Sequence, residues 1–232
     1  PRLARLMAAG QDEQCVVELA AIAALMQGEG VAMKGGLNDN LRDSADYTDF
    51  QAEWRAVEKA VDAGFEAGAC TRWGISARGA REVWMAYRQL LSIGSRGKSR
   101  EMPEPDFTAA RPAVVRAMME SFADHVGVRN GVAANTCRMA GGVGGRLAEG
   151  SVAFHGEHFV AAEVAELSGK AVETRVGRCT LIDPEELRAV RPERFSGGEA
   201  AVFDAALRRV RLHRRLMYED LVLEDRDRGD AP

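Results

Sequence analysis

Cysteine is scarce in this chain, and its scarcity excludes two common ways of holding a small fold together. The four cysteines among 232 residues, Cys15, Cys70, Cys137 and Cys179, lie far apart in sequence and form no CxxC pair. Disulfide frameworks and zinc sites depend on closely spaced cysteines, so we expect neither. The segments around the four cysteines look buried, which predicts reduced core thiols and a cytoplasmic protein.

Long hydrophobic runs and an excess of one charge are also missing. The longest apolar run, VVELAAIAALM at residues 16–26, is too short to span a bilayer and too far inside to be a signal peptide, so we expect a soluble chain. With 31 basic and 35 acidic residues, the formal net charge is -4. The protein as a whole therefore does not attract nucleic acid or an anionic membrane, and any such affinity must be local.

The residues that catalysis or metal binding would need are absent too. The segment SIGSRGKS at residues 92–99 differs from a phosphate-binding P-loop at its first position, where Ser92 replaces glycine, and its flanks do not predict the required strand and helix. His155 and His158 flank Glu157 in a predicted turn that offers no third ligand. We therefore predict no catalytic residue, no metal site and no ATP hydrolysis by this chain alone.

What the first half does contain is helical periodicity, which covers residues 1–93. The opening stretch PRLARLMAAG predicts a short helix that ends at Gly10, and a helix at the very start of a chain is expected to continue something before it. Apolar faces near residues 16–26 and 50–61 predict two further helices around a glycine-rich loop. A longer helix follows, with Ser76 as its expected cap.

The character of the sequence then changes. Residues 94–112 hold three prolines and little apolar content, which predicts a linker. Residues 113–195 contain short strand patterns with turn signals such as RNG and GGVGG, typical of a small barrel, and residues 196–232 predict a further strand pair. The expected fold class is α+β: a helical bundle, a small OB-like β-barrel and a C-terminal strand extension.

Two groups of arginines are the candidate binding residues. On the predicted helix SARGAREVWMAYRQLL, Arg78, Arg81 and Arg88 share a side that differs from the apolar face. Arg138 and Arg146 flank the turn GGVGG, whose glycines permit a close approach of a ligand or simply form a tight turn. Arginines placed in this way either contact a phosphate backbone or form a solvated surface, and the sequence leaves both open.

Several stretches, taken in order, resemble the accessory region of bacterial DEAH-box helicases. The stretch ACTRWGISARGAREVWMAYRQLLSI is similar to the end of the helicase-associated "ratchet" domain of that family, and PRLARLMAAG resembles its opening helix. SFADHVGVR, CRMAGGVGGRLAEGS, FVAAEVAEL and TLIDPEEL resemble the OB-like domain that follows the ratchet. The tail VFDAALRRVRLHRRLMYEDLVLED is similar to the start of the C-terminal extension of the HrpB-type subgroup.

The resemblance implies an accessory part of an ATP-dependent helicase, with RecA-like motor domains and a winged helix upstream. ATP and magnesium would belong to those motor domains, and this chain would hold no cofactor. Its partners would be the motor domains and single-stranded nucleic acid, RNA rather than DNA, contacted without reading bases. The alternative is a protein-interaction module that docks a helicase regulator and binds no nucleic acid.

Overall fold

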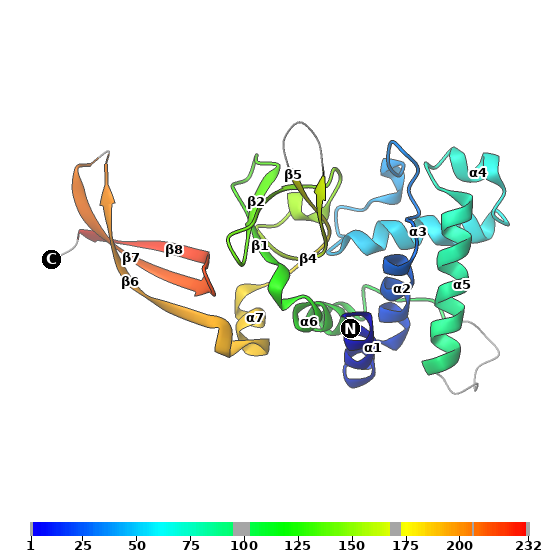
Figure 1. Ribbon diagram of the computed structural model, residues 1–232, viewed down its shortest axis with the longest axis horizontal. Helices are drawn as coiled ribbons and strands as arrows, with labels where there is room; N and C mark the ends of the chain where they lie inside the picture. The colour runs from blue at the N-terminus through cyan, green and yellow to red at the C-terminus, as the bar shows by residue number, and fades with distance from the viewer. Residues whose placement is uncertain (1, 95–102, 168–172, 206, 231–232) are drawn as a thin grey trace.

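The computed structural model describes residues 2–94, 103–167, 173–205 and 207–230. Helices gather at one end of its longest axis, a β-barrel lies in the middle, and a three-stranded sheet projects from the other end (Figure 1). The helical end contains α1 (Arg2–Asp12), α2 (Val16–Gln27), the 3-10 turn η1 (Asp39–Leu41), α3 (Asp49–Asp62), α4 (Ala67–Thr71) and α5 (Ala77–Gly94). The expected helical first half is confirmed.

Helix α5 forms where the sequence predicted it, and for the predicted reasons. The Ser76 hydroxyl accepts a hydrogen bond from the Gly79 backbone N–H at 3.1 Å, which caps the first turn. Val83 and Tyr87 are fully buried on the apolar face. The Tyr87 ring meets Trp54 of α3 edge-on, with 4.7 Å between ring centroids, so aromatic packing fixes α5 against α3.

The first helix is longer than the sequence predicted. Gly10 does not end α1, because the helix continues to Asp12 and the chain turns at Gln14, which has a φ of 59°. A Cβ on Gly10 would lie 3.1 Å from Leu19 Cδ1. The prediction of a cap at Gly10 is therefore wrong: this glycine lets α1 approach α2 closely.

The barrel comes after the helical end in the chain. Residues 95–102 of the connection, and with them most of SIGSRGKS, lie outside the described structure. The barrel and the short helices beside it comprise α6 (Arg111–Ser121), η2 (Ala123–His125), β1 (Val126–Arg129), β2 (Thr136–Met139), β3 (Gly144–Leu147), η3 (Val152–Phe154), β4 (His158–Leu167), β5 (Glu173–Leu181), α7 (Pro184–Val190) and η4 (Pro192–Arg194). Asp183 caps α7 by accepting from the backbone N–H of Glu185 at 2.8 Å.

The five strands close in the order β1-β2-β3-β5-β4, with β4 paired back to β1. All pairs are antiparallel except β3 and β5, which run parallel. The turn between β2 and β3 lies at residues 140–143, and Gly144 and Gly145 of GGVGG are already the start of β3. This closed five-stranded barrel is consistent with an OB-like domain, and the α+β fold class is confirmed.

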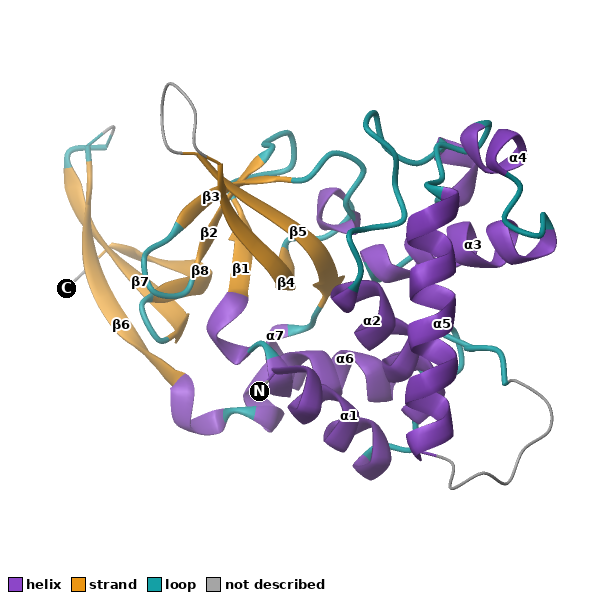
Figure 2. Ribbon diagram, turned by 45° about the vertical axis from the view of Figure 1, so that its right-hand side comes forward, coloured by secondary structure: helices purple, strands orange, loops and turns teal. Residues whose placement is uncertain are grey.

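The projecting sheet, which we call the arm, is formed by β6 (Phe195–Asp204), β7 (Arg209–Tyr218) and β8 (Leu221–Asp230), hydrogen-bonded in that order. The sequence predicted two strands here, but the structure has three. The arm stands apart from the barrel except at its base (Figure 1), and in the view of Figure 2 its strands β7 and β8 overlap the barrel. There the Tyr218 hydroxyl donates to the Ala123 carbonyl at 2.8 Å, and His158 Nε2 donates to the Leu223 carbonyl at 2.9 Å.

Two hydrophobic clusters form the core of the helical end and the barrel, which we together call the body. The larger one runs from the helical end through α6 to residues of β1, α7 and the base of the arm, and the smaller one fills the barrel. All four cysteines are buried and free, as the sequence predicted. None of the described helices is both long and apolar enough to cross a membrane. The division into domains at residues 1–93, 94–112, 113–195 and 196–232 stays a prediction.

Candidate nucleic-acid interface

The three arginines of α5 lie on its exposed side but differ in their surroundings. Arg78 Nε donates to Glu82 one turn later at 2.8 Å, which offsets part of its charge. The Arg81 guanidinium lies 5.0 Å from the centroid of the Phe65 ring, a cation–π contact that positions it. Arg88 is exposed and makes no ion pair within the described part of the chain. Arg88 is therefore the freest of the three for an anion.

Arg81 and Arg88 line one shallow depression along α5, together with Met85 and Gln89. Met85 is 58% exposed, which is unusual for a large apolar side chain. Arg78 does not line this depression. The structure thus brings two of the three predicted side chains together, with an apolar patch between two cations.

Arg138 and Arg146 lie on the outer surface of the barrel, on adjacent strands. In the β2–β3 pair Arg138 is opposite Gly144, and Arg146 is opposite Thr136. Both side chains are exposed, and Arg146 forms an ion pair with Glu173 of β5. In OB folds the face of strands 2 and 3 is a common site for oligonucleotides. Arg138, which has no ion pair among the described residues, is the better placed of the two.

Arg175 extends this barrel surface, and sequence analysis did not single it out. It is exposed on β5 directly opposite Arg146, because β3 and β5 pair in parallel. Only the topology shows this, since 29 positions separate the two arginines in sequence. The α5 group and the barrel group are not brought together: α5 and the β2–β3 pair lie at different ends of the body in both ribbon views (Figures 1 and 2).

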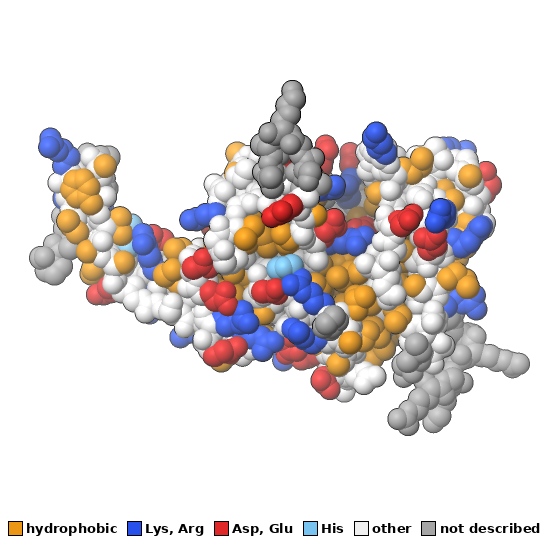
Figure 3. Space-filling model, viewed as in Figure 1, with side chains coloured by type: hydrophobic (Ala, Val, Ile, Leu, Met, Phe, Trp, Pro, Cys, Tyr) orange, Lys and Arg blue, Asp and Glu red, His pale blue; other side chains and the backbone are white. Residues whose placement is uncertain are grey.

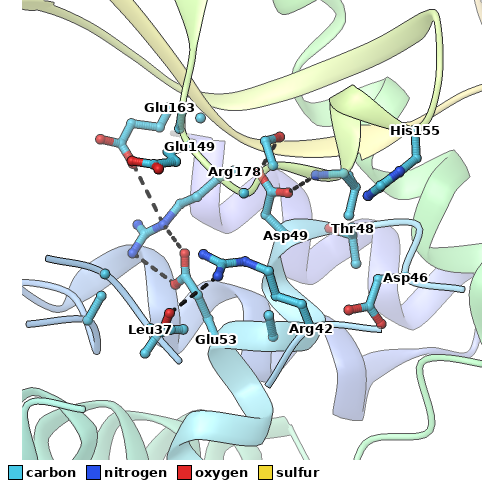
Figure 4. Close-up of a pocket in the computed structure, with 18 of the residues that line it drawn as sticks. Leu37, Arg42, Asp46, Thr48, Asp49, Glu53, Glu149, His155, Glu163 and Arg178 are labelled. Atoms are coloured by element: carbon cyan, nitrogen blue, oxygen red, sulfur yellow. Dashed lines mark hydrogen bonds and ion pairs between the residues drawn. The ribbon is translucent and has the colours of Figure 1, made fainter. Parts of the chain in front are cut away.

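A polar pocket of about 180 Å³ lies where the start of α3 meets the barrel, and we call this meeting point the joint (Figure 4). Asp49, the first residue of α3, reaches into the barrel. Its carboxylate accepts from the backbone N–H of Val152 and of Cys179, both at 2.7 Å, and from the Ser151 hydroxyl at 2.9 Å. Burial raises the pKa of Asp49, and these three hydrogen bonds oppose the rise.

One turn along α3, Glu53 faces the barrel arginine Arg178. The guanidinium holds both carboxylate oxygens, at 3.1 and 3.2 Å, and also lies 3.7 Å from Glu163 (Figure 4). Burial raises the pKa of Glu53 while the charge of Arg178 opposes it. Arg178 has a φ of 52°, so the strand is held in an uncommon backbone conformation where the pair forms.

These contacts give the pocket a structural explanation. The carboxylates of Asp49 and Glu53 already accept hydrogen bonds from other residues of the chain. The described residues contain no group of three or more side chains that could hold a metal ion. His155 is exposed at the rim, and His158 is bound to the base of the arm, so they do not form a metal pair. We interpret the pocket as part of the contact that fixes the helical end on the barrel.

Comparison with solved structures finds the same fold in two crystal structures of the E. coli protein HrpB, described as a DExH-box NTPase and as a DEAH/RHA helicase. Both superpose with a TM-score of 0.53 over 100% of this chain and 23% of the other, at 20% and 16% sequence identity. This chain thus spans less than a quarter of those proteins. No protein-family model and no curated protein sequence matches it. At the level of the fold, the expected resemblance to an HrpB-type helicase is confirmed.

Proposed function

We propose that this chain is an accessory region of an ATP-dependent DEAH-box helicase and guides a single strand of nucleic acid by contacts to its phosphates. The observation that carries the proposal is that Arg81 and Arg88 lie together in one exposed depression on α5. They do so in a chain whose whole length matches about a quarter of a solved helicase structure. Neither arginine has an ion pair among the described residues, and the carboxylate that shares the depression, Glu82, is bound to Arg78, so both guanidinium groups can hold a phosphate.

The contacts are sequence-independent. Arginine side chains that hold phosphates position a strand but do not distinguish bases, which suits a motor that must move along any sequence. The barrel would add a second contact through Arg138 and Arg146. ATP and magnesium would be bound by RecA-like motor domains elsewhere in the protein, with RNA as the preferred strand.

The test measures binding of a fluorescein-labelled 20-nucleotide single strand, as RNA and as DNA, by fluorescence anisotropy at several salt concentrations. Each neutralised phosphate contributes about 0.7 to the slope of log affinity against log salt, so changing Arg78, Arg81 and Arg88 to Gln should lower the slope by about 1.4, because Arg81 and Arg88 each lose a contact and Arg78, bound to Glu82, loses none. An unchanged slope in a folded triple variant would contradict the proposal. Tighter binding of DNA than of RNA would overturn only the RNA preference.

A second candidate function is a docking module for a regulator protein. The observation that favours it is the apolar outer part of the arm, where Phe203 is 64% exposed and its cross-strand neighbour Val210 is 44% exposed. Hydrophobic side chains gather on that part of the surface (Figure 3), and such patches often mark protein interfaces. If the wild-type chain binds no single strand, while a Phe203→Ser variant loses a partner captured with the helicase, the docking module is the better explanation.

A further inference from the structure

A groove of about 520 Å³ lies on the arm, between its sheet and α7. Residues of α7, β6, β7 and β8 line it, and five of them are arginines, against three acidic residues. We call it the arm groove. It is separate from the α5 depression and from the barrel arginines, which lie on other elements.

Two of the five groove arginines are already neutralised by neighbouring carboxylates. Arg215 donates to Asp225 at 3.0 Å, and Arg226 lies 2.7 Å from Glu224. The groove residue Asp227 is bound to Arg211, outside the groove.

Three arginines remain, Arg188, Arg214 and Arg228. All three are exposed, and none has an ion pair among the described residues. The groove therefore presents three exposed arginines without an ion pair, against one carboxylate, that of Glu185 on α7, which also has no ion pair among the described residues.

The strand register places two arginines side by side. Arg214 on β7 is directly opposite Arg226 on β8 and, on its other side, directly opposite Glu199 on β6. Like charges in opposite positions of an antiparallel pair are destabilising. Glu224 neutralises Arg226 only in part, since the Arg226 side chain is 73% exposed. An anion bound between the two guanidinium groups would relieve the repulsion.

Two consecutive glycines of β6, Gly197 and Gly198, line the groove. Consecutive strand residues face opposite sides of a sheet, so only Gly197, which is opposite Leu216, shares the side of Arg214. A Cβ on Gly197 would lie 2.9 Å from the Arg215 carbonyl oxygen, so this glycine lets β6 approach β7 closely beside the arginines.

We propose that the arm groove is a second phosphate-binding site, which holds the backbone of a single-stranded nucleic acid through Arg188, Arg214 and Arg228. The guanidinium fork fits phosphate oxygens in a bidentate way. Phe195 is the one aromatic residue in the lining, so the groove offers little for bases to stack on, and it is suited to a backbone. This inference extends the proposed function, because it assumes that a single strand is the ligand of this chain.

The test uses the whole chain and the same labelled 20-nucleotide strand. Changing Arg188, Arg214 and Arg228 to Gln should lower the slope of log affinity against log salt by about 2, since three phosphate contacts at about 0.7 each are lost. Circular dichroism should show a melting temperature no lower than that of wild type, because all three side chains are exposed and the loss of Arg214 removes its repulsion with Arg226.

A charge-matched control excludes a general effect of net charge. Changing Arg5, Arg72 and Arg208 to Gln removes the same number of exposed charges from scattered positions. This control should leave the slope within about 0.5 of wild type, because it removes no clustered contact. A control that lowers the slope as much as the groove variant would overturn the site.

The remaining outcomes separate this inference from the proposed function. If the α5 variant lowers the slope and the groove variant does not, the arm groove is wrong and the proposed function stands. If only the groove variant lowers it, the strand binds on the arm and the α5 contact is wrong. A 20-residue poly-glutamate that displaces the strand as well as an unlabelled strand does would overturn the phosphate assignment and identify an acidic-peptide site.

Discussion

The joint and the arm both contain many charged residues, but they use them in opposite ways. At the joint, the buried carboxylate of Asp49 has three hydrogen-bond donors and Glu53 has a bidentate arginine. On the arm, ion pairs such as Arg215–Asp225 are one-third exposed, and further arginines have no acidic partner in the described structure. A charge at the joint is bound by partners within the chain and stabilises the fold, whereas an unpaired arginine on the arm can bind another molecule.

The difference follows from desolvation. A buried charge is costly unless its partners replace the water it loses, so removing one partner leaves the other charge uncompensated. An exposed pair is screened by water and salt and contributes little. Mutations at the joint should therefore act on stability, and mutations on the arm should act on binding.

Thiol reactivity should show the largest contrast. Burial raises the pKa of Cys15 to about 12 and that of Cys137 to about 11, and it also raises the pKa of Cys70 and of Cys179, so the thiolate fraction at pH 8 is small. A Phe203→Cys variant would place an ordinary thiol on the exposed outer part of the arm. At pH 8, Ellman's reagent should label one thiol per chain at least about a hundredfold faster than the buried native four.

The wild-type chain and the same variant in urea are the controls for this measurement. Wild type should show almost no labelling until it unfolds, and the unfolded variant should react at all five thiols. Rapid labelling of a native cysteine in folded wild type would show that the body opens as readily as the arm.

The next largest effect should come from the ion pair at the joint. Arg178→Met removes the cation and leaves Glu53 buried, which should lower the free energy of unfolding by about 3 kcal/mol in urea titrations. A double variant that also carries Glu53→Leu should recover most of this loss, because an apolar pair can replace a buried ion pair. A single variant that costs less than about 1 kcal/mol would mean that solvent reaches the pair.

A third prediction concerns the buried end of α3. Asp49→Asn would turn an amide group toward backbone N–H donors, so at least one hydrogen bond is lost and the unfolding free energy should fall by about 2 kcal/mol. Asp62→Asn is the matched control, since it makes the same change at the exposed far end of the same helix. Equal effects of the two changes would show that the joint does not depend on Asp49.

Much of the fold could be predicted from the sequence because it depends on local signals. The apolar face and cap of α5, the turn between β2 and β3, and the cap of α7 are all set by residues close in sequence. The prediction at Gly10 was wrong because glycine also serves close packing, and the partner that requires it, Leu19, lies on the next helix. The arm strand that was missed is β6, because Gly197 and Gly198 interrupt its pattern and are typical of a turn.

The candidate sites were harder to predict because their residues come from distant parts of the chain. Glu53 and Arg178 are 125 positions apart, and no local pattern joins them. Arg188, Arg214 and Arg228 meet only because α7 lies at the base of a sheet whose strands pair in one register. The α5 arginines could be found because they lie on one helix, where spacing alone decides which residues share a side.

The smallest effect should come from an exposed pair on the arm. Asp225 accepts from His213 Nδ1 at 2.6 Å and from Arg215 at 3.0 Å, so Asp225→Asn removes two ionic contacts at once. All three side chains are partly exposed, and such pairs contribute on the order of 0.5 kcal/mol each, so the unfolding free energy should fall by about 1 kcal/mol or less. Raising the salt to 1 M should remove even this difference, because the charges are screened. If Asp225→Asn instead costs as much as Asp49→Asn, the arm is held by its charges as firmly as the joint, and its arginines are less free for a ligand than we propose.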